Sequence, residues 1–328
     1  MTHPRPPLAR CSNGELVQRL VAGHVSRLVD LQIPVLADDD PEPLHQMRVA
    51  MRRLRTTLRQ FAPAVVLPGG VSDQRIARSV RRLGLARDLD VLRQRLRDEL
   101  PALPQQEAAA LKPVFRQLKR ERRVAYTQLV EVLRGRSHLE LLARLQEWLR
   151  RPEFTPLGRE PLGRWLPEWQ LPPLLQLFVH SGWWAEDPQG QAERVHDLRK
   201  QIKDARYRLE NLRHCGGRRQ RAAISDFRNL QDLLGELHDL EVLTAAINQQ
   251  TPHSLASDLP VLAVALEQRR RCCWERWRDE ARRLNSAAAR AELLHGLQRE
   301  LARHRLKVMC PVIHGRVSPR LATAMACR

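Results

Sequence analysis

Hydrophobic residues recur every three or four positions through almost the whole chain, the spacing that places them on one face of an α-helix. No stretch alternates hydrophobic and polar residues between turn signals in the way that predicts a β-strand. The pattern therefore predicts an all-α protein. The expected helices cover residues 13–33, 44–61, 72–85, 88–100, 105–133 and 137–149, and then 174–184, 192–214, 218–234, 239–249, 259–284 and 287–306.

Prolines and glycines divide the chain into two halves of similar length. A segment rich in proline and tryptophan, residues 151–173, is predicted to join a first half at about 12–150 to a second half at about 174–306. We interpret the two halves as one module within residues 1–306. Residues 307–328 lack helical periodicity, and we expect them to form a mobile tail.

The two halves repeat each other at a fixed offset of 151 residues. The Leu-Gly pair at 83–84, for example, recurs at 234–235. A repeat on this scale indicates that one structural unit is present twice. The matching basic pairs are His45 with His196, Arg48 with Arg199, Arg52 with Lys203 and Arg55 with Arg206.

Composition narrows the class of partner. A chain of 328 residues, of which 43% are hydrophobic, is long enough to bury a substantial core. Lysine and arginine number 56 against 37 acidic residues, which gives a net charge of +19. Such an excess favours a polyanionic partner, although it does not identify which one.

Cysteine usage and apolar runs bear on location. The six cysteines show neither a C-x-x-C pair nor a regular spacing, so we predict no zinc site, no disulfide framework and a cytoplasmic location. Residues 1–10 do not resemble a signal peptide. The longest uninterrupted apolar run, 259–266, is far shorter than the ~18 residues that span a bilayer. We therefore expect a soluble protein with no membrane partner.

The basic residues form a stripe on one helix face in each half. Positions 45, 48, 52, 55 and 59 step by three or four, whereas apolar positions 47, 51, 54, 58 and 61 lie about 120° away around the helix. Burial of the apolar stripe therefore determines where the cations point. The stripes consist of His45, Arg48, Arg52, Arg55 and Arg59 in the first half, and of His196, Arg199, Lys203 and Arg206 in the second.

This cationic face is typical of phosphate binding. Like charges four residues apart repel by roughly 0.2–0.5 kcal/mol per pair, yet residues 44–61 contain five arginines and no acid. Guanidinium groups bind phosphate in a two-pronged, charge-assisted geometry, so a bound polyanion would turn repulsion into attraction. His45 and His196 can donate to phosphate in either protonation state. A structural role for each histidine and a merely solvated arginine face remain the alternatives.

Other motifs suggest no further chemistry. Asp88, Asp90, Asp239 and Glu241 could be metal ligands, but residues two apart on a helix do not face one another. We interpret them as helix caps or as partners that orient Arg or His, and we expect no metal, cofactor or catalytic residue. The glycines at 84 and 235 are interpreted as sites of close helix approach. A second basic patch has no basic counterpart in the other half, and its role stays open: Arg75, Arg78, Arg81 and Arg82.

The segments that carry the repeat resemble the CHAD family, the conserved-histidine α-helical domain. The resemblance rests on LHQMRVAMRRLR at residues 44–55, on its second copy at 195–207, and on the motifs at 83–91 and 234–242. It covers about residues 12–306. Paired signatures at one offset make it specific.

The resemblance implies two helical bundles, related by a pseudo-twofold axis, around a basic central channel or groove that holds inorganic polyphosphate. It also implies association with polyphosphate granules. The implied binding residues are His45, Arg48, Arg52, Arg55, His196, Arg199, Lys203 and Arg206, with Arg59 as a weaker addition because its counterpart is Glu210. We therefore predict a non-enzymatic polyphosphate-binding protein of open oligomeric state.

Two other functions are compatible with the sequence. A general DNA- or RNA-binding protein would use the charge of +19, although no nucleic-acid-binding signature is evident and aromatic residues make up only 4%. A phosphate-processing enzyme would need metal-binding carboxylates or an activated nucleophile beside the cations. The duplicated face offers neither.

Overall fold

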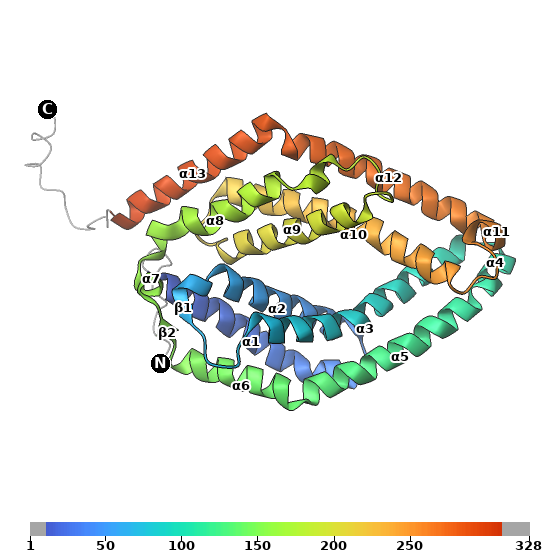
Figure 1. The fold of residues 1–328 in the computed structure, drawn as a ribbon, viewed down its shortest axis with the longest axis horizontal. Coiled ribbons are helices and arrows are strands. Elements are labelled where there is room, and N and C mark those ends of the chain that lie inside the picture. The colour runs from blue at the N-terminus through green and yellow to red at the C-terminus, as the bar shows by residue number, and fades with distance from the viewer. Residues whose placement is uncertain (1–10, 310–328) are drawn as a thin grey trace, which may run out of the picture.

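The computed structural model describes residues 11–309, and their side chains as far as residue 302. The described part is almost entirely helical, which confirms the predicted all-α class (Figure 1). The first half contains α1 (Asn13–Ala37), α2 (Pro41–Gln60), α3 (Asp73–Glu99), α4 (Gln105–Ala110), α5 (Lys112–Arg134) and α6 (Arg136–Arg150). The rest contains α7 (Pro156–Arg159), α8 (Leu162–Phe178), α9 (Ala192–Asn211), α10 (Arg218–Asn248), α11 (Leu255–Asp258), α12 (Pro260–Asn285) and α13 (Ala287–Met309).

The first three helices begin at side-chain caps. Ser12 and Glu15 form a capping box at the start of α1, in which each side chain bonds to the other residue's backbone N–H. Asp40 accepts a hydrogen bond from the backbone of Glu42 and is followed by Pro41, a residue suited to the first helical turn. Ser72 caps α3 through the backbone N–H of Arg75. The starting point of each of these three helices is thus determined by residues next to it in the sequence.

Two pairs of predicted helices are single helices in the structure. α3 runs without a break through residues 85–88, and α10 runs through 234–239. The predicted breaks, at residues 86–87 and 235–238, lie close to Gly84 and begin at Gly235, but a helix tolerates an interior glycine at a cost of about 1 kcal/mol when packing compensates. The helix predicted at 105–133 instead divides at Leu111, where Pro113 lies in the first turn of α5.

The joint and the C-terminal boundary also differ from the sequence prediction. Residues 151–173 contain α7 and most of α8, and the latter has Pro167, Pro172 and Pro173 inside it. Two-residue strands β1 (Val65–Val66) and β2 (Glu153–Phe154) pair antiparallel, so the expectation of no strand was wrong. Strands this short leave no alternating pattern. α13 continues to Met309 beyond the expected end at 306, and the rest of the predicted tail, 310–328, lies outside the described residues.

Among the described residues, one helix, α1, is long and apolar enough to cross a membrane by length and composition alone. The sequence prediction overlooked it because isolated polar residues interrupt its apolar runs. Val17, Val21 and Leu28 of this helix are buried in the core of the first half, where α1 packs along α2. A core helix passes the same test of length and composition.

Buried apolar residues form three clusters. One lies mainly among helices of the first half and a second among helices of the second half. The third combines both halves, because Leu92, Leu96 and Leu118 pack with Leu240 and Leu262. Four of the helices that supply this cluster, α3, α5, α10 and α12, converge at one end of the molecule in Figure 1. The halves are therefore joined there by shared apolar packing.

The halves also meet where α2 and α9 end. Asn211 donates to Gln60 at 2.9 Å, and both side chains are buried. These two residues are themselves 151 positions apart, so they are counterparts in the repeat. Beside them, Arg53 donates to Glu210 at 2.6 Å. Polar contacts thus set the register of α2 against α9.

A second polar contact between the halves, which joins α4 to the start of α12 through Glu107, can be tested by mutation. Its carboxylate is buried and accepts from the backbone N–H groups of Val261 and Leu262, at 2.9 and 3.0 Å, at the start of α12. Glu107→Ala leaves both donors unpaired and is expected to lower the free energy of unfolding by about 1–3 kcal/mol, as measured by chemical denaturation. Glu121→Ala, an exposed position on α5, serves as the control with little change expected. Equal stabilities for the two variants would contradict this role.

Candidate functional site

The apolar stripes of α2 and α9 determine the direction of their cations. Met47, Met51 and Leu54 are fully buried on one face of α2, and Leu198 and Ile202 are fully buried on the matching face of α9. Each basic stripe is therefore turned away from its own core. Because α2 contacts α9, the two stripes face the same space.

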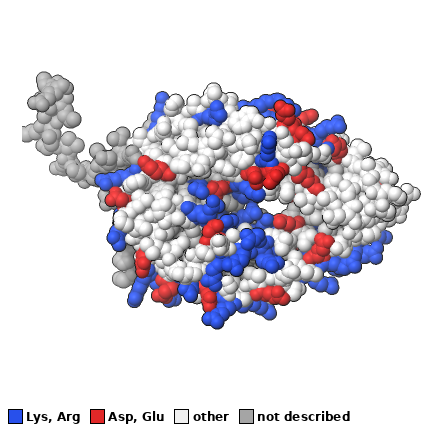
Figure 2. Space-filling model, in the orientation of Figure 1, with Lys and Arg blue, Asp and Glu red and all other residues white. Residues whose placement is uncertain are grey.

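A central cavity of about 420 Å³ lies between α2, α3, α9 and α10. Figure 2 shows lysine and arginine side chains gathered around a hollow in the middle of the molecule. Six of the nine predicted binding residues line this cavity, three from each half: His45, Arg48, Arg52, His196, Arg199 and Lys203. Equivalent cations of the repeat are thus brought together.

Lys203 lies in the most unfavourable electrostatic environment of the cavity. Its side chain has no ion pair among the residues described, and burial together with the charges of Arg52, Arg199, Arg48 and Arg206 lowers its pKa to about 6. No carboxylate is among the main causes of the shift. An amine in such surroundings gains strongly from any anion that enters the cavity.

Arg52 and several neighbouring donors also lack protein acceptors. Within the described part of the chain, Arg52 has no hydrogen bond or ion pair, and burial and then Arg48 lower its pKa. The buried Nε atoms of Arg48, Arg87 and Arg199 and Nδ1 of His196 have no hydrogen-bond partner there either. Buried polar groups are normally paired, so this group of donors is suited to an anionic ligand.

The carboxylates near the cavity are engaged by arginines. Arg48 donates to Asp88 at 2.7 Å, and Arg95 of α3 donates across the halves to Asp239 at 2.9 Å. Asp88 and Asp239 lie inside α3 and α10, so the predicted role as helix caps was wrong for both. The predicted role in orienting basic side chains is confirmed. Outside the cavity, Asp90 accepts from Arg122 at 2.9 Å and Glu241 lies 3.9 Å from His238.

The paired glycines contact arginines and not a neighbouring backbone. A β-carbon on Gly84 would lie 3.4 Å from Nη2 of Arg48, and one on Gly235 would lie 3.4 Å from Nη2 of Arg199. The part of the neighbouring helix that approaches each glycine is an arginine side chain, from α2 toward Gly84 and from α9 toward Gly235. Each glycine leaves room for the guanidinium of the repeat's own arginine to lie along the adjacent helix.

Three of the predicted binding residues lie outside the central cavity. Arg55 donates to Asp73 through two hydrogen bonds at 2.6 and 2.7 Å, which raise its pKa. Arg206 is only 7% exposed and donates to Glu210 at 2.7 Å and to Gln231 at 3.1 Å. Arg59 is exposed near the end of α2. The structure thus separates Arg55, Arg59 and Arg206 from the six residues that it brings together.

The two histidines lie at one end of the basic stripes. Burial and then the charge of Arg87 lower the pKa of His45, and burial and then Lys200 lower that of His196. The ring of His196 stacks at an angle on His238, with centroids 4.8 Å apart. Both histidines are therefore biased toward the neutral form, which can still donate one hydrogen bond.

With this geometry described, the comparisons with known proteins can be stated. The profile of the CHAD domain matches residues 19–248. The chain belongs to the CHAD domain family. The solved CHAD domain from the plant Ricinus communis is 24% identical with a TM-score of 0.56, over 88% of this chain and 93% of that one. PptA from Streptomyces chartreusis is 16% identical with a TM-score of 0.57, over 82% and 99%. None of the curated proteins matches the chain.

The family match confirms the resemblance, and the geometry adds residues that sequence reasoning missed. Arg95 lines the cavity, but its counterpart in the repeat is alanine, so the duplication could not reveal it. Arg87 and His238, which occupy one repeat position with different side chains, line the same cavity together. Tyr207 also lines it, and is covered by the guanidiniums of Arg206 and Arg53, 4.6 and 5.3 Å from the ring centre.

The lowered pKa of Lys203 predicts how stability depends on pH in this CHAD domain. The folded protein resists protonation of Lys203 down to about pH 6, whereas the unfolded chain binds the proton below the ordinary value of 10.5. Stability without ligand should therefore rise with pH across this range. Lys203→Met is expected to raise the denaturation midpoint at about pH 7, and the gain should shrink toward about pH 9.5.

The control for this prediction is Lys200→Met on the same helix. Lys200 is 63% exposed and pairs with Asp197 at 2.9 Å, so its removal should change the midpoint little at any pH. Chemical denaturation of the three proteins across the pH range gives the comparison. A destabilised Lys203→Met protein, or a gain that does not vary with pH, would contradict the assignment.

Proposed function

We propose that this protein binds inorganic polyphosphate in the central cavity. The observation that carries the proposal is the position of Lys203, a buried amine surrounded by four arginines, with no carboxylate among the main causes of its lowered pKa. A protein gains no stability from concentrating unpaired charge in this way. The arrangement is explained by a ligand that supplies several negative charges at once.

The chemistry of the cavity favours phosphate groups over other anions. Arginine presents several N–H donors in a planar fork that matches phosphate oxygens, and the cavity combines five arginines with a lysine and three histidines. The cations come from both halves, so one ligand must carry charge over the whole width of the cavity. A linear polymer of phosphate meets both requirements without any base or sugar.

We also propose that the two halves are related by an approximate twofold axis, with the cavity as part of a basic channel between them. Supporting this, the counterparts Gln60 and Asn211 bond to each other, as residues near a twofold axis can. Gly84 lies against Arg48 as Gly235 lies against Arg199. Both halves would then contact the ligand in matching ways.

The proposed contacts are the six predicted residues that line the cavity, joined by Arg87, Arg95 and His238. Arg55 and Arg206 are proposed to contribute less, because Asp73 and Glu210 already engage them. Arg59 stays a weaker peripheral candidate. The carboxylates of the cavity, Asp88 and Asp239, pair with Arg48 and Arg95, so we propose that the site binds its ligand without catalysis. We further propose that the protein acts in the cytoplasm, at polyphosphate granules.

Charge reversal inside the cavity tests this function. Arg52→Glu combined with Lys203→Glu places carboxylates where phosphates would bind, and is expected to abolish retention of the protein on immobilised long-chain polyphosphate. The helical circular dichroism spectrum should survive, because neither residue belongs to the apolar stripes. Retention is measured as the salt concentration needed for elution.

The matched control is Lys112→Glu combined with Lys119→Glu. Both lysines are exposed on α5, and their reversal changes the net charge by the same amount. The control should elute close to wild type, apart from a small shift due to net charge. If the cavity variant and the control elute together, the cavity is not the binding surface.

General nucleic-acid binding is the second candidate, favoured by the net charge of +19. Against it, the one aromatic residue among those lining the cavity, Tyr207, is buried under two guanidiniums and cannot offer its face to a base. At physiological salt, polyphosphate is expected to displace bound DNA at equal phosphate concentration. The measurement is fluorescence anisotropy of labelled DNA, and displacement in the opposite order would favour the nucleic-acid function.

A further inference from the structure

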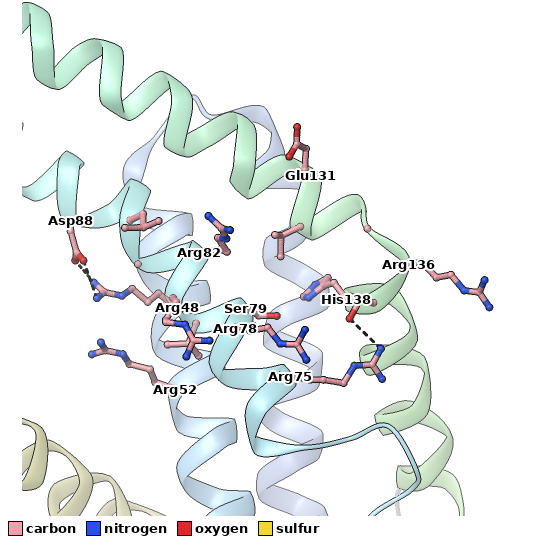
Figure 3. A pocket seen from close by; sticks show the side chains of 17 residues that line it. Arg48, Arg52, Arg75, Arg78, Ser79, Arg82, Asp88, Glu131, Arg136 and His138 are labelled. Atoms are coloured by element: carbon pink, nitrogen blue, oxygen red, sulfur yellow. Dashed lines mark hydrogen bonds and ion pairs between the residues drawn. The ribbon is translucent and has the colours of Figure 1, made fainter.

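A second cavity, of about 960 Å³, lies between α3 and the turn that connects α5 to α6. We call it the side groove. Arg48, Arg52 and Asp88 line both this groove and the central cavity, so the two spaces adjoin. In Figure 3, Arg48 and Arg52 extend from α2 on one side of α3, while Arg75 and Arg78 extend from α3 toward α6. The groove therefore begins where the central cavity ends.

The side groove is basic, and much of its charge is not neutralised. Within the described part of the chain, Arg78 and Arg81 have no hydrogen bond or ion pair. Arg82 donates only to the neutral amide of Gln128, at 2.9 Å. Arg75 is held across the groove by Ser137 at 3.1 Å and by the backbone oxygen of Gly70 at 2.7 Å. Glu140 lies 3.5 Å from Arg75 but is shared with Arg136.

Two uncharged features of the groove also suit an anion. α6 begins there at Arg136, and the preceding Gly135 supplies no side-chain cap, so the uncapped first turn and the positive end of the helix dipole lie at the groove. His138 on this turn is 3% exposed, and neither ring nitrogen has a hydrogen-bond partner within the described residues. Figure 3 shows its ring between α6 and α3, near Ser79.

The second half cannot form an equivalent groove. The residues that correspond to the four α3 arginines, 151 positions later, are Asp226, Asn229, Asp232 and Leu233. Asp226 pairs with Arg283 at 3.0 Å, so this face is closed by an internal ion pair. Any ligand that extends from the central cavity along α3 thus does so on one side only.

We propose that the side groove binds further phosphate groups of the chain held in the central cavity, so that long polyphosphate leaves the site over α3 and α6. This inference rests on the proposed function, and it adds the side on which a long chain leaves the central cavity. Short chains occupy the central cavity alone, whereas long chains also use Arg78, Arg82 and the first turn of α6. The arginines of the side groove then make the protein bind long chains more tightly than short ones.

The test compares two probes, tripolyphosphate and long-chain polyphosphate, on the full chain. Arg78→Gln combined with Arg82→Gln is expected to weaken binding of the long chain about tenfold and to reduce the slope of log K against log salt by about 1 for each arginine. Binding of tripolyphosphate should stay within about twofold of wild type. Isothermal titration calorimetry at several salt concentrations provides both quantities.

The matched control is Arg116→Gln combined with Arg120→Gln, two exposed arginines of α5 with the same spacing and charge change. A second variant removes no arginine: Ser137→Asp adds a carboxylate to the groove at a helix position where acids are favourable. It should likewise weaken only the long chain, and it keeps the test valid if the arginine variant folds poorly.

The outcomes separate this inference from the function on which it rests. Wild type that binds long polyphosphate, with groove variants indistinguishable from the control, would overturn the groove alone. Equal losses for tripolyphosphate and the long chain would overturn the division into two segments. Wild type that binds neither probe would overturn both proposals.

Discussion

Repulsion among the cations of α2 and α9 is the constraint to which the rest of the structure responds. Burial of the apolar stripes turns both basic faces inward, where Lys203 lies among Arg52 and Arg199 and has no ion pair of its own among the described residues. Desolvated like charges oppose the packing of one half on the other. The contacts that hold α2 against α9 must therefore outweigh a local electrostatic penalty.

Those contacts surround the cavity and do not enter it. Glu210 accepts from Arg53 and Arg206, and so ties the halves together while removing one predicted cation from the ligand surface. Gln60 and Asn211 bond in the buried contact between the helices. Further away, the third apolar cluster joins the halves without any charge. Apart from the Arg95–Asp239 ion pair, these contacts between the halves lie outside the cavity, and Arg52 and Lys203 have no ion pair among the described residues.

The basic surface outside the cavity differs between the two halves. Both halves contribute matching cations to the central cavity, but only the first carries free arginines onward along α3. In the second half the corresponding face is closed by Arg283 on Asp226. The repeat in the sequence is thus matched by residues at the central cavity, whereas the outer faces of the two halves differ. Under the proposed function, this difference would direct a long bound chain toward one side.

The sequence by itself determined the helical class, the repeat, the family and six of the residues that share the cavity, because periodicity and spacing are local properties. Only the tertiary structure decided which cations remain unpaired. Asp73 engages Arg55 across the loop between α2 and α3, and Arg95 reaches the cavity from a position with no basic counterpart. Glu210 engages Arg206 one turn away on the same helix, a local pair that the repeat did not reveal. The continuity of α3 and α10 likewise depended on packing, since Gly84 and Gly235 interrupt a helical pattern in sequence but lie against arginines in space. Charge pairing between distant segments leaves no trace in residue spacing, and for that reason the final site required the fold.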